Sequence, residues 1–220
     1  MDLIYKNTPQ RDLMLTFLPP AKKKWEKAPV YFIIPGGGWH TSIRQSMIDF
    51  SAISVNALRE EGFAVVAIDY RVVKEGVVWD EIVGDCFDAV RYISHFADTL
   101  EIDKKKFVMS GHSAGGHLAA LTSTYTKPID FEGIDDIDKE DFLPNAQILC
   151  YPVINLHDKD IAHIGSGDNL IGNNYEETKA ALQKRMRQYP TVVSIDDLDI
   201  AKDNLAELKQ DRATISKAQK

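Results

Sequence analysis

The stretch that decides the fold reads FVMSGHSAGGHLAA and spans residues 107–120. An apolar, β-prone run (107–109) passes through a glycine-flanked serine into a run of helix-forming small residues, which is G-x-S-x-G between a strand and a helix. A sharp turn at this place would hold Ser113 in a strained conformation and expose its hydroxyl. Gly111 and Gly115 leave out side chains that would collide across such a turn. The pattern predicts that Ser113 is a catalytic nucleophile, and the alternative is a glycine-rich connection in a nucleotide-binding sheet.

Composition and charge restrict the classes of function. The chain has 220 residues, which suits one large domain, and its net charge of −7 disfavours a nucleic-acid or anionic membrane surface. No signal-peptide pattern and no bilayer-length apolar run occur in the sequence. Its two cysteines, Cys86 and Cys150, lack metal-ligand spacing and indicate buried thiols in a reducing compartment. We therefore expect a cytoplasmic protein without a metal or cofactor.

The order of apolar segments predicts an α/β fold. Alternating strands and helices favour a mostly parallel sheet with helices on both faces. Residues 11–18 are expected to form the first or second strand, at a sheet edge, and Lys104–Lys106 a solvated loop. Asp85 and Asp88 are expected on the solvated side of their helix. The further expected strands are 30–34, 63–68, 107–109 and 147–151, and the expected helices are 47–61, 80–97 and one that begins near His117.

A second glycine motif follows the buried strand 30–34. Residues 35–39 read PGGGW, and consecutive glycines after a strand indicate backbone that closely approaches another group. Open α/β sheets place their sites at the carboxyl ends of the strands, where this turn and the serine turn would meet. The N–H of Ala114 and those of Gly36–Gly38 would then form an oxyanion hole. A phosphate cradle is disfavoured, since no Lys-Ser/Thr follows the glycines.

At this point the chain resembles the α/β-hydrolase superfamily, and more closely the small esterases grouped with acetyl-xylan esterases and the hormone-sensitive-lipase branch. The resemblance covers about residues 10–172 and implies a serine carboxylesterase that acts on small acyl groups, often acetyl esters of sugars. It implies Ser113 as the nucleophile and the backbone of Gly36, Gly37 and Ala114 as the oxyanion hole. The segments that carry it are IIPGGGW (33–39), AIDYR (67–71), DEIVGDCFDAVRYI (80–93), VMSGHSAGGHLA (108–119), LCYPVINL (149–156) and AHIGSGDNLIG (162–172).

The chain departs from this superfamily after the nucleophile, where an acid and then a histidine should follow. The histidines downstream of Ser113 are His117, His157 and His163. His117 lies one turn along the same helix, so it cannot easily reach the serine hydroxyl and is expected to pack against the sheet or to cap a contact. His157 and His163 lie in the loop after the sixth strand. The resemblance places the acid on Asp199, and the alternative is that Asp199 begins a helix over 200–218.

The domain organisation follows from these segments. Residues 1–188 are expected to form the α/β-hydrolase core, and 189–220 a seventh strand and a polar helix. The last strand, its histidine and the last helix of the fold are expected to be missing, which would expose a sheet edge and favour a homodimer. Two functions remain open: an esterase of small acyl esters, or a catalytically incompetent, truncated hydrolase-like protein that only binds ligand. The expected partner is a small ester, with neither nucleic acid nor membrane.

Overall fold

The computed structural model describes residues 1–124, 136–137 and 139–154. The chain divides into two units, Met1–Tyr175 and Glu176–Lys220, and all described residues lie in the first. The expectations for His157, His163, Asp199, the strand at 189–195 and the helix at 200–218 therefore lie outside the described residues. No helix in the described ranges is long and apolar enough to cross a membrane.

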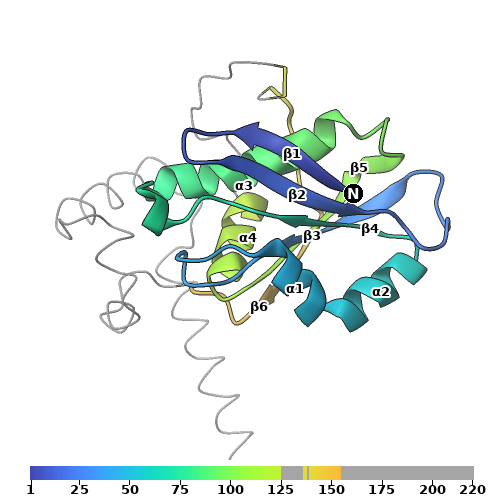
Figure 1. Cartoon of the computed structure of the whole chain (residues 1–220). Coiled ribbons are helices and arrows are strands. Elements are labelled where there is room, and N and C mark those ends of the chain that lie inside the picture. The colour runs from blue at the N-terminus through green and yellow to red at the C-terminus, as the bar shows by residue number, and fades with distance from the viewer. Residues whose placement is uncertain (125–135, 138, 155–220) are drawn as a thin grey trace, which may run out of the picture. The chain divides into compact units, whose positions relative to one another are not determined.

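The described strands form one mixed sheet in the order β1-β2-β4-β3-β5-β6 (Figure 1). The first two strands are antiparallel to their neighbours, whereas β4, β3, β5 and β6 are mutually parallel. This confirms the mostly parallel sheet. The strands are β1 (Asp2–Asn7), β2 (Asp12–Leu18), β3 (Ala28–Ile34), β4 (Ala64–Ile68), β5 (Ile102–His112) and β6 (Ala146–Cys150).

Helices cover both faces of the sheet, as expected. Alternate residues of β3 point to opposite faces, so Ile33 packs with Val55 of α2 while Phe32 belongs to the cluster that includes α3 and α4. The continuous apolar sequences of β3 and β4 follow from burial on both faces. The helices are α1 (Arg44–Phe50), α2 (Ala52–Glu60), α3 (Trp79–His95) and α4 (Ala114–Thr124), with a 3-10 turn, η1 (Val73–Glu75), before α3.

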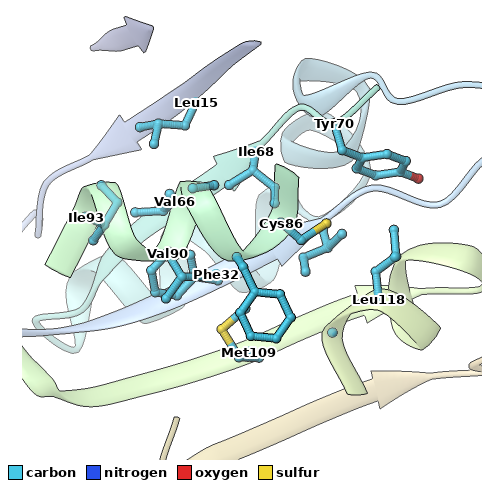
Figure 2. Packing of buried hydrophobic residues seen from close by; sticks show 14 of the residues in the cluster. Leu15, Phe32, Val66, Ile68, Tyr70, Cys86, Val90, Ile93, Met109 and Leu118 are labelled. Atoms are coloured by element: carbon cyan, nitrogen blue, oxygen red, sulfur yellow. The ribbon is translucent and has the colours of Figure 1, made fainter. Parts of the chain in front are cut away.

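The larger core lies between the sheet and α3 with α4. Figure 2 shows Phe32 and Met109 from neighbouring strands beside Val90 and Cys86 of α3. Each of these side chains is completely shielded from solvent. Cys86 is therefore the buried thiol that the sequence predicted, but Cys150 is only partly buried.

Three local expectations in the first half of the chain were wrong. Strand β1 forms the sheet edge, so the strand expected at 11–18 is the second strand and is flanked on both sides. The helix expected over 47–61 is two helices that meet at Ser51, whose ψ of 13° departs from helical geometry. Lys104–Lys106 lie within β5 and not in a loop, and remain exposed there.

The expectation that Asp85 and Asp88 lie on the solvated side of α3 was also wrong. Asp85 has no exposed side-chain surface, and it accepts hydrogen bonds from Arg71 and Lys6. Lys6 also binds Asp88 at 2.6 Å. Burial raises the pKa of Asp88, whereas the two carboxylates beside Lys6 raise the pKa of that amine against its own burial. Strand β1 supplies this lysine, and its charge offsets the cost of burying the two carboxylates.

Candidate active site

The turn at Ser113 joins β5, which ends at His112, to α4, which begins at Ala114. Ser113 has a φ of 54°, in the left-handed region that a side chain with a Cβ rarely adopts. Its backbone N–H donates to the carbonyl of Cys150 at 3.0 Å, and its own carbonyl accepts from His117 N at 3.1 Å. The surrounding backbone thus holds the strained serine between the end of β6 and the first turn of α4.

Two glycines make this turn possible. A Cβ on Gly111 would collide with the carbonyl of Gly115 across the turn. A Cβ on Gly115 would collide with the carbonyl of Ile34 and would lie 2.5 Å from that of Pro35. The first is the close approach across the turn that the sequence predicted for the G-x-S-x-G motif, whereas the second is to the end of β3. They bring the first turn of α4 directly against the end of β3.

The second glycine motif lies beside the serine turn. A Cβ on Gly36 would lie 2.6 Å from the His112 carbonyl oxygen and 3.6 Å from the Ser113 Cβ. We call residues 35–42 the oxyanion turn. Its chain reverses through the left-handed conformations of Gly38 (φ 60°) and Trp39 (φ 59°), and Gly37 O accepts from His40 N at 3.0 Å and Thr41 N at 3.2 Å.

The backbone amides around Ser113 are available to an anion. Within the described part of the chain, the N–H groups of Gly36, Gly37 and Ala114 have no hydrogen-bond acceptor. The amide of Ala114 also begins α4, where the helix dipole favours negative charge. Free amides next to a strained serine are the arrangement that stabilises an oxyanion formed on that serine.

His117 packs against aromatic rings of α3 and the oxyanion turn. Its ring stacks on Trp79 of α3 at 5.0 Å and meets the edge of Trp39 at 5.8 Å. Burial lowers the pKa of His117 to about 4, so the ring is neutral at pH 7. This neutral side chain joins α3, α4 and the oxyanion turn. It makes no hydrogen bond to the serine hydroxyl among the contacts of the described residues.

His112, immediately before Ser113, also lies among aromatic rings. Its ring is 5.5 Å from Phe50 at the end of α1 and 5.7 Å from Tyr151. It lines a cavity of about 460 Å³ on the α2 side of the sheet, together with Cys150. Burial lowers the pKa of His112, and its Nδ1 has no hydrogen-bond partner among the described residues. Neither His112 nor His117 is therefore arranged as a histidine of a triad.

Sequence reasoning assigned no role to Tyr70 and Trp79, which lie behind this site. Tyr70 was part of the AIDYR segment that carried the resemblance, and its phenol contacts the oxyanion turn. Trp79 is the first residue of α3, where an aromatic residue beside acidic ones gave no sign of a partner. The sequence did contain one indication of a role for Tyr70. This residue follows a buried strand directly, at the carboxyl end of the sheet where the glycine motifs meet.

The sheet order and the strained serine turn between β5 and α4 are those of the α/β-hydrolase class. The chain matches the family described as BD-FAE over residues 15–194, and it belongs to that family. Among solved structures it resembles Thermogutta terrifontis esterase 2, in its propionate-bound form, with 28% sequence identity and a TM-score of 0.61. That similarity covers 72% of this chain and 57% of the esterase.

The chain is also similar in sequence to two curated proteins. A 118-residue region is 30% identical to the "Probable isoprenylcysteine alpha-carbonyl methylesterase ICME" of Oryza sativa subsp. japonica, covering 54% of this chain and 27% of that protein. A 158-residue region is 30% identical to the "Methylphloroacetophenone synthase" of Cladonia uncialis, covering 69% of this chain and 5% of the synthase. The chain thus spans well under two thirds of the length of these relatives.

Proposed function

We propose that the protein is a serine carboxylesterase for small acyl esters, with Ser113 as its nucleophile. The observation that carries this proposal is the position of the strained Ser113 against Gly36, with the free amides of Gly36, Gly37 and Ala114 around it. A serine hydroxyl next to unpaired amide donors suits attack on a carbonyl whose oxygen becomes negative.

The reaction follows from these groups. Ser113 Oγ attacks the acyl carbon while its proton passes to a base, and the former carbonyl oxygen becomes the oxyanion bound by the three amides. The C–O bond to the alcohol then breaks, and the alcohol leaves with a proton from the protonated base. Water hydrolyses the acyl-serine in the same manner. Downstream of Ser113 the candidates are Asp199 for the acid and His157 or His163 for the base, and both histidines precede Asp199, which reverses the usual order of acid and base in this fold.

Acetyl esters, including acetylated sugars, are the substrate class that we favour. The resemblance of the motifs to acetyl-xylan esterases supports a small acyl group, and the similar Thermogutta esterase was solved with propionate and with butyrate. The similar plant protein is named as a methylesterase. These likenesses agree on a small group on one side of the ester bond.

Covalent labelling tests the assignment of Ser113. The intact protein is incubated with p-nitrophenyl acetate or with paraoxon, and the modified residue is located by peptide mass spectrometry. We expect the label on Ser113 and none in Ser113→Ala. Ser123→Ala, a serine on the same α4 helix whose hydroxyl bonds to Ala119 O, is the matched control and should be labelled like the wild type. A label distributed over other serines and unchanged by Ser113→Ala would contradict the proposal.

A second candidate is a hydrolase-like protein that binds an acyl ligand without turnover. It is favoured by the surroundings of His112 and His117, whose rings pack against aromatic side chains and leave Ser113 without an imidazole partner in the described part of the chain. This candidate predicts acetate binding without Ser113-dependent hydrolysis. Steady-state hydrolysis by the wild type and Ser113→Ala distinguishes the two.

We propose a reducing compartment, the cytoplasm, for this reaction. The net charge of −7 and the free thiols of Cys86 and Cys150 support that location. A small ester is the proposed partner. A homodimer through a sheet edge also remains a proposal, which sedimentation at several protein concentrations would test.

A further inference from the structure

The segment after β4 lies behind the oxyanion turn and is bonded to it at several points. Residues 69–73 form this segment, which we call the 69–73 loop. It donates to the turn from one side chain and two backbone amides. The three bonds run from Tyr70 Oη to Pro35 O at 2.7 Å, from Tyr70 N to Ser42 Oγ at 3.1 Å, and from Val73 N to Trp39 O at 3.0 Å.

The bond to Pro35 bears directly on the oxyanion hole. The carbonyl of Pro35 and the N–H of Gly36 belong to one peptide group, and no cis peptide bond occurs among the described residues. In a planar trans peptide the C=O and the N–H point in opposite directions. The phenol of Tyr70, which fixes the carbonyl oxygen, therefore also fixes the direction of the Gly36 N–H. A hydrogen bond accepted by the carbonyl further polarises the same peptide group.

Tyr70 itself has little freedom. Its side chain is completely buried, and Figure 2 shows it at one end of the core cluster with its hydroxyl turned away from Ile68. Burial raises the pKa of Tyr70 well above its ordinary value, so that the phenol remains a proton donor. The next residue, Arg71, donates to the buried Asp85 through its backbone N–H and through Nε and Nη2 of its guanidinium, at 2.8–3.0 Å.

We propose that Tyr70 is a positioning residue of the active site: its hydroxyl orients the Pro35–Gly36 peptide so that the Gly36 N–H points at the oxyanion formed on Ser113. The inference rests on the proposed function for the identity of that anion. It adds that the direction of one oxyanion donor, the Gly36 N–H, depends on the buried phenol of Tyr70. The oxyanion turn cannot set this direction by itself, because Gly36 and Gly37 have the least restricted backbones of any residue.

The chain offers a matched control in Tyr5. Its hydroxyl also donates from a buried side chain to a backbone carbonyl at 2.7 Å, and that carbonyl belongs to Asp69 in the same loop. Tyr5→Phe and Tyr70→Phe therefore each remove one buried phenol bond to the backbone. Only Tyr70→Phe removes a bond from the peptide group that contains the Gly36 N–H. A purely structural role for Tyr70 predicts the same outcome for both variants.

The experiment uses the full chain labelled with ¹⁵N and acetate as the anionic probe. Acetate affinity is measured from the amide signals of Gly36, Gly37 and Ala114, and Ser113 acetylation by p-nitrophenyl acetate is measured separately as a rate and a half-saturation concentration. For Tyr70→Phe we expect acetate binding and the maximal acetylation rate to fall by about 10-fold or more, with half-saturation unchanged and the Gly36 amide signal shifted. Tyr5→Phe should match the wild type in acetate affinity, acetylation rate, half-saturation and the Gly36 amide signal. This should hold even if Tyr5→Phe lowers the unfolding midpoint as much as Tyr70→Phe does.

Each outcome decides the inference separately from the proposed function. If Ser113 is not acetylated but acetate binds and Tyr70→Phe weakens it, the positioning role stands and the esterase function fails. If Ser113 is acetylated at the same rate in Tyr70→Phe and the wild type, the positioning role is wrong and the function stands. Equal losses in Tyr5→Phe and Tyr70→Phe, or no acetate binding by the wild type, would also overturn the positioning role.

Discussion

Gly36 lies so close to Ser113 that a Cβ atom on the glycine would be 3.6 Å from the Cβ of the serine. The two residues are 77 positions apart in the sequence and come from turns at the ends of the adjacent parallel strands β3 and β5. Register places Ile34 opposite Gly111, so both chains leave the sheet at the same level. The contact therefore depends on the absence of a side chain at Gly36 as much as on the strand order.

We predict that Gly36→Ala separates the two turns. Its Cβ would lie 2.6 Å from the His112 carbonyl oxygen, which is backbone and can move only with the serine turn. Ser113 acetylation should fall on the order of 100-fold, the typical effect of losing one oxyanion donor. Labelling rates with p-nitrophenyl acetate measure this.

Gly76→Ala is the control for that substitution. Gly76 has no neighbouring atom within 4 Å of an added Cβ, but its φ is 75°. It should lower the unfolding free energy by about 1–2 kcal/mol through backbone strain and leave Ser113 labelling unchanged. Equal labelling rates in both variants would show that the Gly36–Ser113 approach does not matter for the reaction.

We predict that Asp85→Asn lowers the free energy of unfolding by about 3–5 kcal/mol. The substitution leaves the Arg71 guanidinium, only 7% exposed, beside a neutral amide. Urea unfolding of the purified protein measures the loss. Glu81→Gln, which removes a 40% exposed partner of the same arginine, should cost less than about 1 kcal/mol. A loss of the same small size for Asp85→Asn would mean that the buried pair contributes no more than a surface pair.

The sequence predicted most of the central sheet for a physical reason. Strands β3 and β4 are buried on both faces, so their apolar runs are continuous and need no knowledge of their neighbours. Likewise, the glycines around Ser113 are required by contacts within a single turn or between adjacent strand ends. The strands and glycine turns, which depend mainly on their local sequence, could therefore be predicted.

The features missed were those that depend on distant partners. Asp85 looks like a solvated helix residue until Lys6 and Arg71 are placed beside it from other elements. Tyr70 looks like an ordinary residue after a strand until the Pro35 carbonyl is seen at 2.7 Å from its hydroxyl. Each of these groups is stabilised by a partner at least 14 residues away, and no periodicity in the sequence records such a pairing.

We predict that His117 makes the protein less stable in acid. Burial lowers its pKa from 6.5 to about 4, so between these values the unfolded chain binds a proton that the folded chain does not. The contribution is complete above pH 6.5 and is lost as pH falls toward 4, up to about 3 kcal/mol. His117→Phe keeps a ring between Trp39 and Trp79 and should remove this part of the acid sensitivity.

Unfolding free energies at pH 7 and pH 4.5 check that prediction for both proteins. The quantity to compare is the difference between wild type and His117→Phe, because raised carboxyl pKa values such as that of Asp88 act in the opposite direction in both. An identical pH dependence in His117→Phe would contradict the neutral, buried state of His117.

The last prediction concerns turnover by the 220-residue chain, which we expect to be very slow. Ser113 is a neutral alcohol at pH 7, and His117, the histidine nearest along α4, is stacked on Trp79 and has its pKa lowered to about 4. With no base positioned beside Ser113 among the described residues, attack there must rely on the amides alone, which in other serine hydrolases leaves roughly 1,000- to 10,000-fold catalysis over water. Steady-state hydrolysis of p-nitrophenyl acetate should thus be slow in the wild type and lower still in Ser113→Ala, because the acyl-enzyme that forms and is then hydrolysed requires Ser113. Replacement of His157 and of His163 by alanine tests the remaining candidates for the base. Turnover on the order of 10 per second, lost equally in Ser113→Ala and in one of these histidine variants, would instead show a working triad assembled from the chain beyond β6.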